Sequence, residues 1–88
     1  DGMTLLEEVK ARLDVTWEYD DPKINTMILE GQDFIKSRVG KTNFDTEISA
    51  RKLLKEYCFY AWNGASYSFE DDFKSDILNL QIKHSLGD

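Results

Sequence analysis

The chain has 88 residues, which is the size of one domain and leaves no room for a second independent core. Its 17 acidic and 11 basic residues give a net charge of −6, which opposes binding to the phosphate backbone of nucleic acids. The single cysteine, Cys58, excludes an internal disulfide, and its apolar neighbours predict a buried thiol in a reducing compartment.

No run approaches the roughly 20 apolar residues that span a bilayer, and the N-terminus lacks the basic and then apolar layout of a signal peptide. We therefore expect a soluble, cytosolic chain that makes no membrane contact. Asp1 and Gly2 precede Met3 and Thr4, where a natural start is expected. We interpret residues 1 and 2 as a remnant of expression and assign them no role.

The first predicted helix begins after Thr4. Thr4 and Glu7 have the spacing of a capping box, in which a hydroxyl and a carboxylate accept hydrogen bonds from free amides of the first turn. Apolar residues then recur at helical spacing along one face, while charged residues face away. The apolar residues are Leu5, Leu6, Val9 and Leu13.

The second predicted helix opens at Pro22, with Asp21 as its N-cap and Gly40 as a left-handed residue after its end. Gly31 lies on the apolar side, where glycine costs about 1 kcal/mol relative to alanine. Either a neighbouring helix approaches closely at Gly31 or the glycine is tolerated drift, and the sequence leaves both interpretations open. The apolar side consists of Ile24, Met27, Ile28, Phe34 and Ile35.

The third predicted helix, capped by Asp45 or Thr46, carries the strongest periodic pattern in the chain. At ~20 residues it would be ~30 Å long, enough to form the centre of the domain. Phe59 and Trp62 project from other sides, so the middle of the helix is apolar nearly all round and must be covered on more than one face. The core stripe consists of Ala50, Leu53, Leu54, Tyr57, Cys58, Ala61 and Ala65.

A fourth helix is predicted where the acidic run 70–72 suits a helix N-terminus. Its stripe consists of Phe69, Phe73, Ile77 and Leu80, widened by Leu78 and Ile82. We expect residues 84–88 to fray. Because no segment alternates strictly, we predict an all-α fold. The predicted domain covers residues 1–88 as a small bundle of about four helices with a long central third helix.

No motif in the sequence supports a cofactor, a metal or catalysis. Gly40-Lys41-Thr42 looks like the end of a phosphate-binding loop, but the first glycine of that pattern would fall on Ile35, inside a predicted helix. Neither acidic run has the alternation of a calcium loop, and Cys58 and His84 are too few for a zinc site. The only imidazole, His84, lies in the tail that we expect to fray. We therefore expect a protein that is not an enzyme.

The chain has more large aromatic side chains than four short helices readily cover. Large aromatic residues are favoured anchors of protein interfaces. Trp17, Phe59 and Trp62 are therefore the candidate protein-interface residues, and we expect a partner subunit to bury at least one of them.

Several motifs, in order, resemble the phage head-tail connector (adaptor) family over nearly the whole chain. They are LLEEVKARL at 5–13, DDPKI at 20–24, ARKLLKEYC at 50–58, FEDDF at 69–73 and ILNLQ at 77–81. The resemblance implies a structural protein of the virion neck that assembles as a ring beneath the portal of a tailed phage or prophage. Such a ring extends the DNA channel and presents an attachment surface to the next neck or tail component.

The partners implied by the resemblance are further copies of the chain, the portal protein and a downstream neck or tail-completion protein. The ring would match the symmetry of the portal, and DNA would pass nearby without sequence-specific binding. The family has no catalytic residues to transfer. A ring built head to tail needs two complementary faces on each subunit, which fits a third helix that is apolar on more than one side.

Three alternatives differ from the connector interpretation. A generic helical protein-interaction module would share its surfaces. An acyl-carrier-like domain would need Asp-Ser-Leu at a helix start, and the nearest match is His84-Ser85-Leu86 in the tail. A helix-turn-helix DNA binder would need a basic recognition helix, whereas Arg51 and Lys55 share the third helix with its core stripe.

Overall fold

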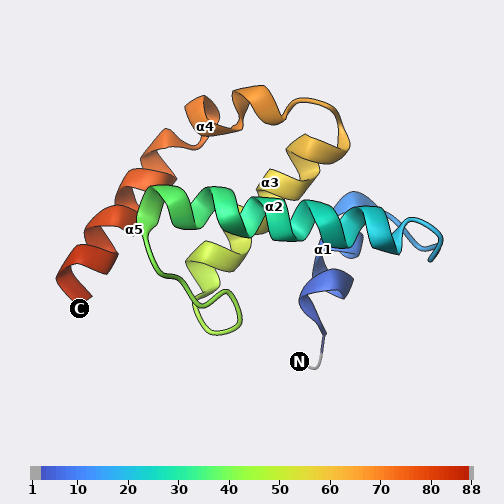
Figure 1. Cartoon of the computed structure of the whole chain (residues 1–88), viewed down its shortest axis with the longest axis horizontal. Helices are drawn as coiled ribbons and strands as arrows, with labels where there is room; N and C mark the ends of the chain where they lie inside the picture. Colours follow the sequence, from blue (N-terminus) through green and yellow to red (C-terminus); the bar gives the residue numbers. More distant parts are fainter. Residues whose placement is uncertain (1–2, 88) are drawn as a thin grey trace.

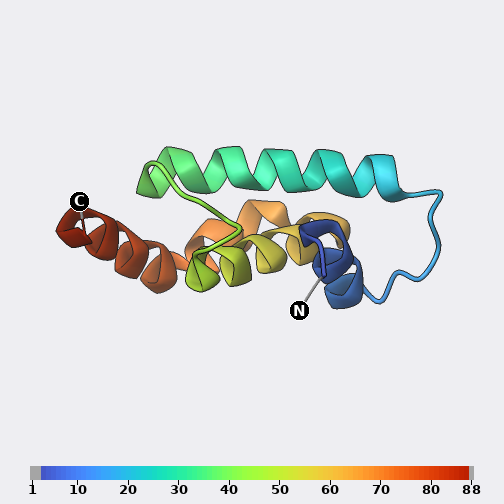
Figure 2. The same cartoon turned by 90° about the horizontal axis from the view of Figure 1, so that it is seen from below.

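The computed structural model describes residues 3–87, and this part of the chain contains helices and loops but no strand, which confirms the all-α prediction (Figure 1). In Figure 2 the longest helix, α2, forms one layer, and the other helices form a second layer beneath it. The elements are α1 (Leu5–Leu13), α2 (Asp21–Val39), α3 (Ile48–Trp62), the 3-10 turn η1 (Ser66–Ser68), α4 (Phe69–Asp72) and α5 (Lys74–Gly87).

Helix α1 begins with the predicted capping box. The Thr4 hydroxyl accepts from the Glu7 amide at 3.1 Å, and the Glu7 carboxylate accepts from the Thr4 amide at 2.8 Å. Two orphan amides of the first turn are thereby satisfied. The helix ends at Leu13, because Asp14 adopts a left-handed conformation with φ of 61°.

Helix α2 starts one residue earlier than predicted. Asp20 occupies the N-cap position without a capping bond from its side chain, and Asp21 is already helical. Both carboxylates have other partners: Asp20 accepts from the Trp17 indole at 2.7 Å, and Asp21 pairs with Lys10 at 2.8 Å. Gly40 follows the helix with the positive φ that was predicted, 87°, although its ψ of −167° lies outside the left-handed helical region.

Gly31 marks the close approach of two helices, which decides between the two interpretations of this residue. A Cβ atom at position 31 would lie 2.7 Å from Leu54 Cδ1 and 2.7 Å from Tyr57 Cδ1. Both neighbours belong to α3, and Gly31 itself is buried. Glycine therefore lets α2 and α3 pack against each other at this point.

Helix α3 is shorter than predicted at both ends. Neither Asp45 nor Thr46 caps it, because the amides of Thr46 and Glu47 donate to the Asn43 carbonyl and extend the preceding turn to residue 47. Helix α3 therefore has 15 residues, and α2, with 19, is the long element of the fold. Helix α3 ends before Gly64, whose φ is 72°.

The C-terminal segment also differs from the prediction. The expected fourth helix is divided at Phe73 into α4 and α5, with the acidic run in the first turn of α4 as predicted. Fraying from residue 84 is wrong for the described residues, since α5 continues to Gly87. His84 holds the end of α5 to the rest of the fold through partners more than 35 residues away, and residue 88 lies outside the described residues.

The core lies between the two layers and draws on every helix. Phe69 of α4 is completely buried among the rings of Phe34, Tyr57, Tyr60 and Phe73, whose centroids lie 4.9–6.0 Å from its own. Aromatic pairs in such geometries add about 0.5–1.5 kcal/mol each beyond their buried area. The other completely buried hydrophobic residues are Val9, Ile24, Ile35, Ala50, Leu54 and Cys58.

Candidate interaction surfaces

Phe59 and Trp62 are partly buried within the chain itself. The Arg12 guanidinium lies 3.9 Å from the centroid of the Phe59 ring, and the Lys23 ammonium lies 5.2 Å from that of Trp62. Arg12 belongs to α1 and Lys23 to α2, so these two helices supply cations that cover the additional apolar faces of α3.

Arg12 is held in place over Phe59 by a second interaction. Its Nε and Nη2 donate to the Glu56 carboxylate at 2.8 and 3.0 Å. This hydrogen bonding to Glu56 raises the pKa of the Arg12 guanidinium above its ordinary value, although burial of the group opposes the rise. The contact places two donors in the fork geometry that carboxylates favour. Arg12 thus connects α1 to α3 and covers Phe59 at the same time.

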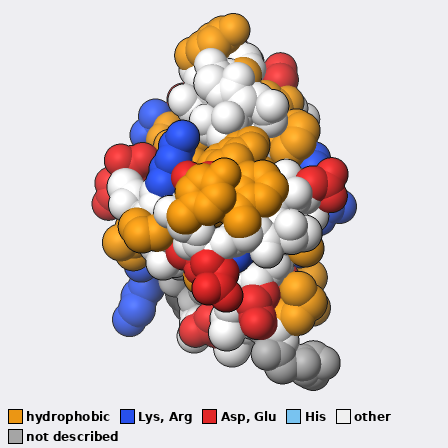
Figure 3. Space-filling view, turned by 90° about the vertical axis from the view of Figure 1, so that its right-hand side faces the viewer, with side chains coloured by type: hydrophobic (Ala, Val, Ile, Leu, Met, Phe, Trp, Pro, Cys, Tyr) orange, Lys and Arg blue, Asp and Glu red, His pale blue; other side chains and the backbone are white. Residues whose placement is uncertain are grey.

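Trp17 lies in the loop of residues 14–20 and is 37% exposed. It stacks on Tyr19, which is 80% exposed, with the ring centroids 5.8 Å apart and the planes inclined at 22°. We call these two side chains the loop patch. Figure 3 views the molecule from the end that carries this loop, and hydrophobic side chains gather there among charged ones. No ring contact within residues 3–87 joins Trp17 to Phe59 or Trp62.

The outer face of α5 is a second exposed apolar surface. Leu78, Ile82 and Leu86 follow one another at spacings of four and are 53%, 48% and 81% exposed. The core side of the same helix carries Ile77 and Leu80, which are buried. Leu78 directly follows Ile77, so it lies about 100° around the helix from it. That offset is the sequence signal for an outward-facing stripe, and the prediction that Leu78 and Ile82 widen the core face is wrong.

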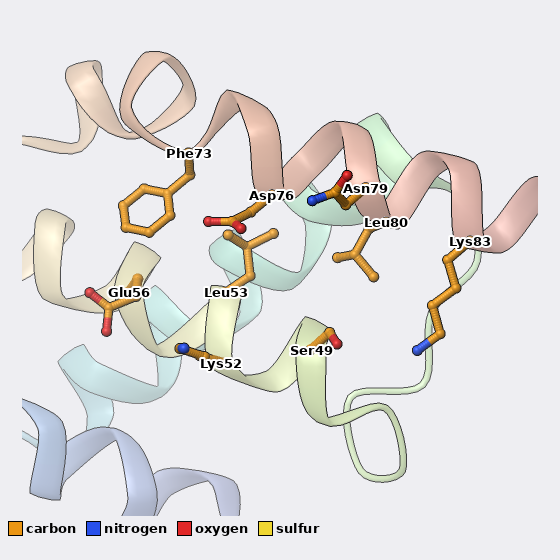
Figure 4. A pocket seen from close by; sticks show the side chains of 9 residues that line it. All are labelled: Ser49, Lys52, Leu53, Glu56, Phe73, Asp76, Asn79, Leu80 and Lys83. Atoms are coloured by element: carbon orange, nitrogen blue, oxygen red, sulfur yellow. The ribbon is translucent and has the colours of Figure 1, made fainter.

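A groove of about 280 Å³ separates α3 from α5 (Figure 4). Leu53, Phe73 and Leu80 lie between the two helices, and charged side chains stand around them. The volume falls just below the ~300–1,000 Å³ of most small-molecule sites. Of the acidic groups in the lining, Glu56 already accepts two hydrogen bonds from Arg12. The remaining lining residues are Ser49, Lys52, Asp76, Asn79 and Lys83.

His84 and Cys58 are the residue types most often used in catalysis. In this structure His84 contacts hydrogen-bond acceptors and Cys58 is buried in the core. The two ring nitrogens of His84 face acceptors, with Nδ1 2.8 Å from the Val39 carbonyl oxygen and Nε2 2.9 Å from both carboxylate oxygens of Glu47. Cys58 is buried, as predicted, and burial raises the pKa of its thiol to about 12. A neutral buried thiol is a poor nucleophile.

The basic residues of α3 are largely engaged by α1. Glu8 pairs with Arg51 at 2.8 Å and with Lys55 at 3.3 Å. These two cations therefore hold α1 against α3, where a recognition helix would present them to phosphates. Among residues 3–87, no cluster of three His, Cys, Asp or Glu side chains has an arrangement that could hold a metal ion. No helix in the same part of the chain is long and apolar enough to cross a membrane.

The fold and these surfaces define a small all-α bundle, in which five of the exposed large apolar side chains of residues 3–87 lie in the loop patch and on the outer face of α5. The other exposed ones are dispersed along the chain and are Met3, Leu29, Ile48 and Tyr67. We compared the chain with models of protein families, with curated proteins and with solved structures, and none of them matches it.

Proposed function

We propose that the chain is a structural assembly subunit, and specifically a head-tail connector that forms a ring beneath the portal of a tailed phage or prophage. The observation that supports an assembly role is the pair of exposed apolar surfaces, the loop patch and the outer face of α5, on one small domain. Exposed apolar patches on small proteins commonly mark contacts with other proteins. The order of the sequence motifs supports the connector among such proteins.

Two different surfaces on one subunit support the proposal of a ring. A subunit that uses one surface toward each neighbour builds a head-to-tail array, which becomes a ring when the rotation closes. The portal protein would contact one side of this ring and a downstream neck or tail-completion protein the other. The net charge of −6 suits a channel past which DNA slides, because it disfavours phosphate binding.

Two of the alternatives have less support. An acyl-carrier-like domain would carry its prosthetic arm on a serine at a helix start, whereas Ser85 lies in the last turns of α5 and its hydroxyl donates to the Ile82 carbonyl. A helix-turn-helix role would need the cations that Glu8 engages. A helical interaction module of another system would use the same surfaces and would differ only in its partner.

Co-expression with the portal protein encoded in the same gene cluster tests the connector function. We expect the chain to co-purify with the portal and to appear in electron micrographs as an added ring below it. A gene cluster without a portal gene, or a chain that stays monomeric and does not bind the portal, would contradict the proposal. An arm found on Ser85 by intact mass after treatment with a phosphopantetheinyl transferase would favour the carrier function.

A further inference from the structure

We infer that the loop patch of one copy packs against the outer face of α5 of the next copy, so that the two surfaces are the two halves of one head-to-tail contact. This inference rests on the proposed function, because it takes a second copy of the chain as the partner of both surfaces. The inference specifies which residues of the two copies are in contact and that the contact runs head to tail.

The positions of the two surfaces favour contact between copies. The loop 14–20 lies at one end of the long axis and the C-terminal half of α5 lies at the other (Figure 1). The molecule measures 41 × 30 × 16 Å, so a single rigid copy cannot cover one surface with the other. Surfaces at opposite ends can meet only between copies, with each copy joined to one neighbour at each end.

Charge distinguishes this polarity from a symmetric pairing of loop with loop. Residues 14–20 contain three acidic side chains, Asp14, Glu18 and Asp20, and no basic one. Two such loops placed face to face would bring like charges together, which is destabilising. A symmetric contact through the loop patch is therefore disfavoured.

The outer face of α5 carries a small excess of positive charge, although Lys74 lies close enough to Glu70 to help lower the pKa of that carboxyl. Residues 74–87 contain two lysines and a single aspartate, in a chain that is strongly acidic as a whole. Lys74 and Lys83 lie on either side of the apolar stripe, and both are exposed. Lys83 also approaches Glu47 at 3.5 Å, but 59% of its side chain stays accessible. The acidic loop of a neighbouring copy would thus meet cations around an apolar centre.

The apolar parts of the two surfaces also suit a contact with each other. Side chains four residues apart on a helix form a ridge, and Leu78, Ile82 and Leu86 form such a ridge on α5. The stacked rings of Trp17 and Tyr19 provide the aromatic side chains that pack against this ridge. Because two aromatic residues and three aliphatic residues form a small interface, each single contact is weak. Closure of the ring then stabilises the array.

Two single variants test the contact, because each variant keeps the surface that the other has lost. Trp17→Asp disables the loop patch and leaves α5 intact, whereas Ile82→Asp disables the outer face of α5 and leaves the loop intact. We expect each variant alone to weaken self-association by about tenfold or more. Mixed in equal amounts, the two should form a 1:1 dimer that grows no further, because only one productive contact remains. Sedimentation velocity from about 10 µM to about 1 mM measures this.

Charge reversal provides a second test on exposed side chains. Glu18→Lys and Lys74→Glu should each weaken self-association, and the chain that carries both substitutions should recover it. Leu29→Asp is the matched control for Trp17→Asp and Ile82→Asp, because Leu29 is 66% exposed but lies on α2, away from both surfaces. We expect the Leu29→Asp chain to assemble as the wild type does. Circular dichroism and melting temperatures verify that every variant is folded.

The outcomes separate this inference from the proposed function. If the wild type assembles and binds the portal, but Trp17→Asp and Ile82→Asp assemble equally well, the inference is wrong and the connector function stands. If Ile82→Asp loses portal binding and keeps self-association, α5 contacts the portal and the inference is again wrong. If Trp17→Asp keeps assembling while Ile82→Asp does not, α5 pairs symmetrically. A wild type that stays monomeric to about 1 mM overturns the inference.

Discussion

Replacing Gly31 with alanine tests the packing of α2 on α3 with one added methyl group. The new Cβ would lie 2.7 Å from Leu54 Cδ1 and from Tyr57 Cδ1, and 3.2 Å from Tyr57 Cε1. Neither neighbour can easily move away. Leu54 is completely buried, and the Tyr57 ring packs between Phe34 and Phe69, with centroid distances of 5.7 and 5.3 Å.

Two effects of opposite sign determine how much Gly31→Ala changes the free energy of unfolding. Overpacking a well-packed core typically costs 1–3 kcal/mol, and the two short contacts place Gly31→Ala toward the upper half of that range, at about 2–3 kcal/mol. The gain in helix propensity from glycine to alanine recovers about 1 kcal/mol. We expect the free energy of unfolding to fall by about 1–2 kcal/mol, with a fall in melting temperature of about 4–8 °C for each kcal/mol.

Urea unfolding followed by far-ultraviolet circular dichroism measures this loss. The pair Asp33→Ala and Asp33→Gly, at an exposed position of α2, gives the propensity difference without a packing change. In a Leu54→Ala background one of the two close contacts is removed, so the cost of Gly31→Ala should shrink. A Gly31→Ala chain that is more stable than the wild type by the full propensity difference would refute the close approach.

Three further predictions concern single side chains. Arg12→Ala should uncover Phe59 and lower the free energy of unfolding by about 0.5–1 kcal/mol in urea titrations, and an unchanged midpoint would contradict the covering role. Cys58 should resist a thiol reagent until the chain is unfolded. Because burial raises the pKa of its thiol to about 12, from an ordinary 9.0, the unfolded state loses its proton first as pH rises. Stability should therefore fall progressively above pH 9, and a flat profile up to pH 12 would contradict this. His84→Ala should cost about 1–3 kcal/mol and speed amide hydrogen exchange in the last turns of α5, whereas unchanged exchange there would show that His84 does not hold the helix.

Features decided by neighbouring residues could be predicted from the sequence. The capping box at Thr4 and Glu7 needs only residues three apart, and a thiol in a strongly periodic apolar stripe, Cys58, is buried for a local reason. The sequence left two interpretations of Gly31 open, because the residues that pack against this glycine are distant from it along the chain. Contact with α3, some 23 residues further along the chain, decided the question.

Features that depend on distant partners were predicted wrongly or missed. The end of α5 is helical because His84 contacts Val39 and Glu47, which are 45 and 37 residues away. For the same reason Leu86, assigned to a frayed tail, instead joins the exposed ridge on α5. Of the three candidate interface residues, Trp17 is exposed, while cations from α1 and α2 cover part of Phe59 and Trp62, which the spacing of residues on α3 alone could not indicate.

A concentration series of the wild-type chain, measured by sedimentation velocity and imaged by electron microscopy, tests the assembly role most directly. We expect the monomer of 10.2 kDa to give way, as concentration rises toward about 1 mM, to closed rings of a single size. A single monomeric species at every concentration, with no ring in any image, would contradict the account.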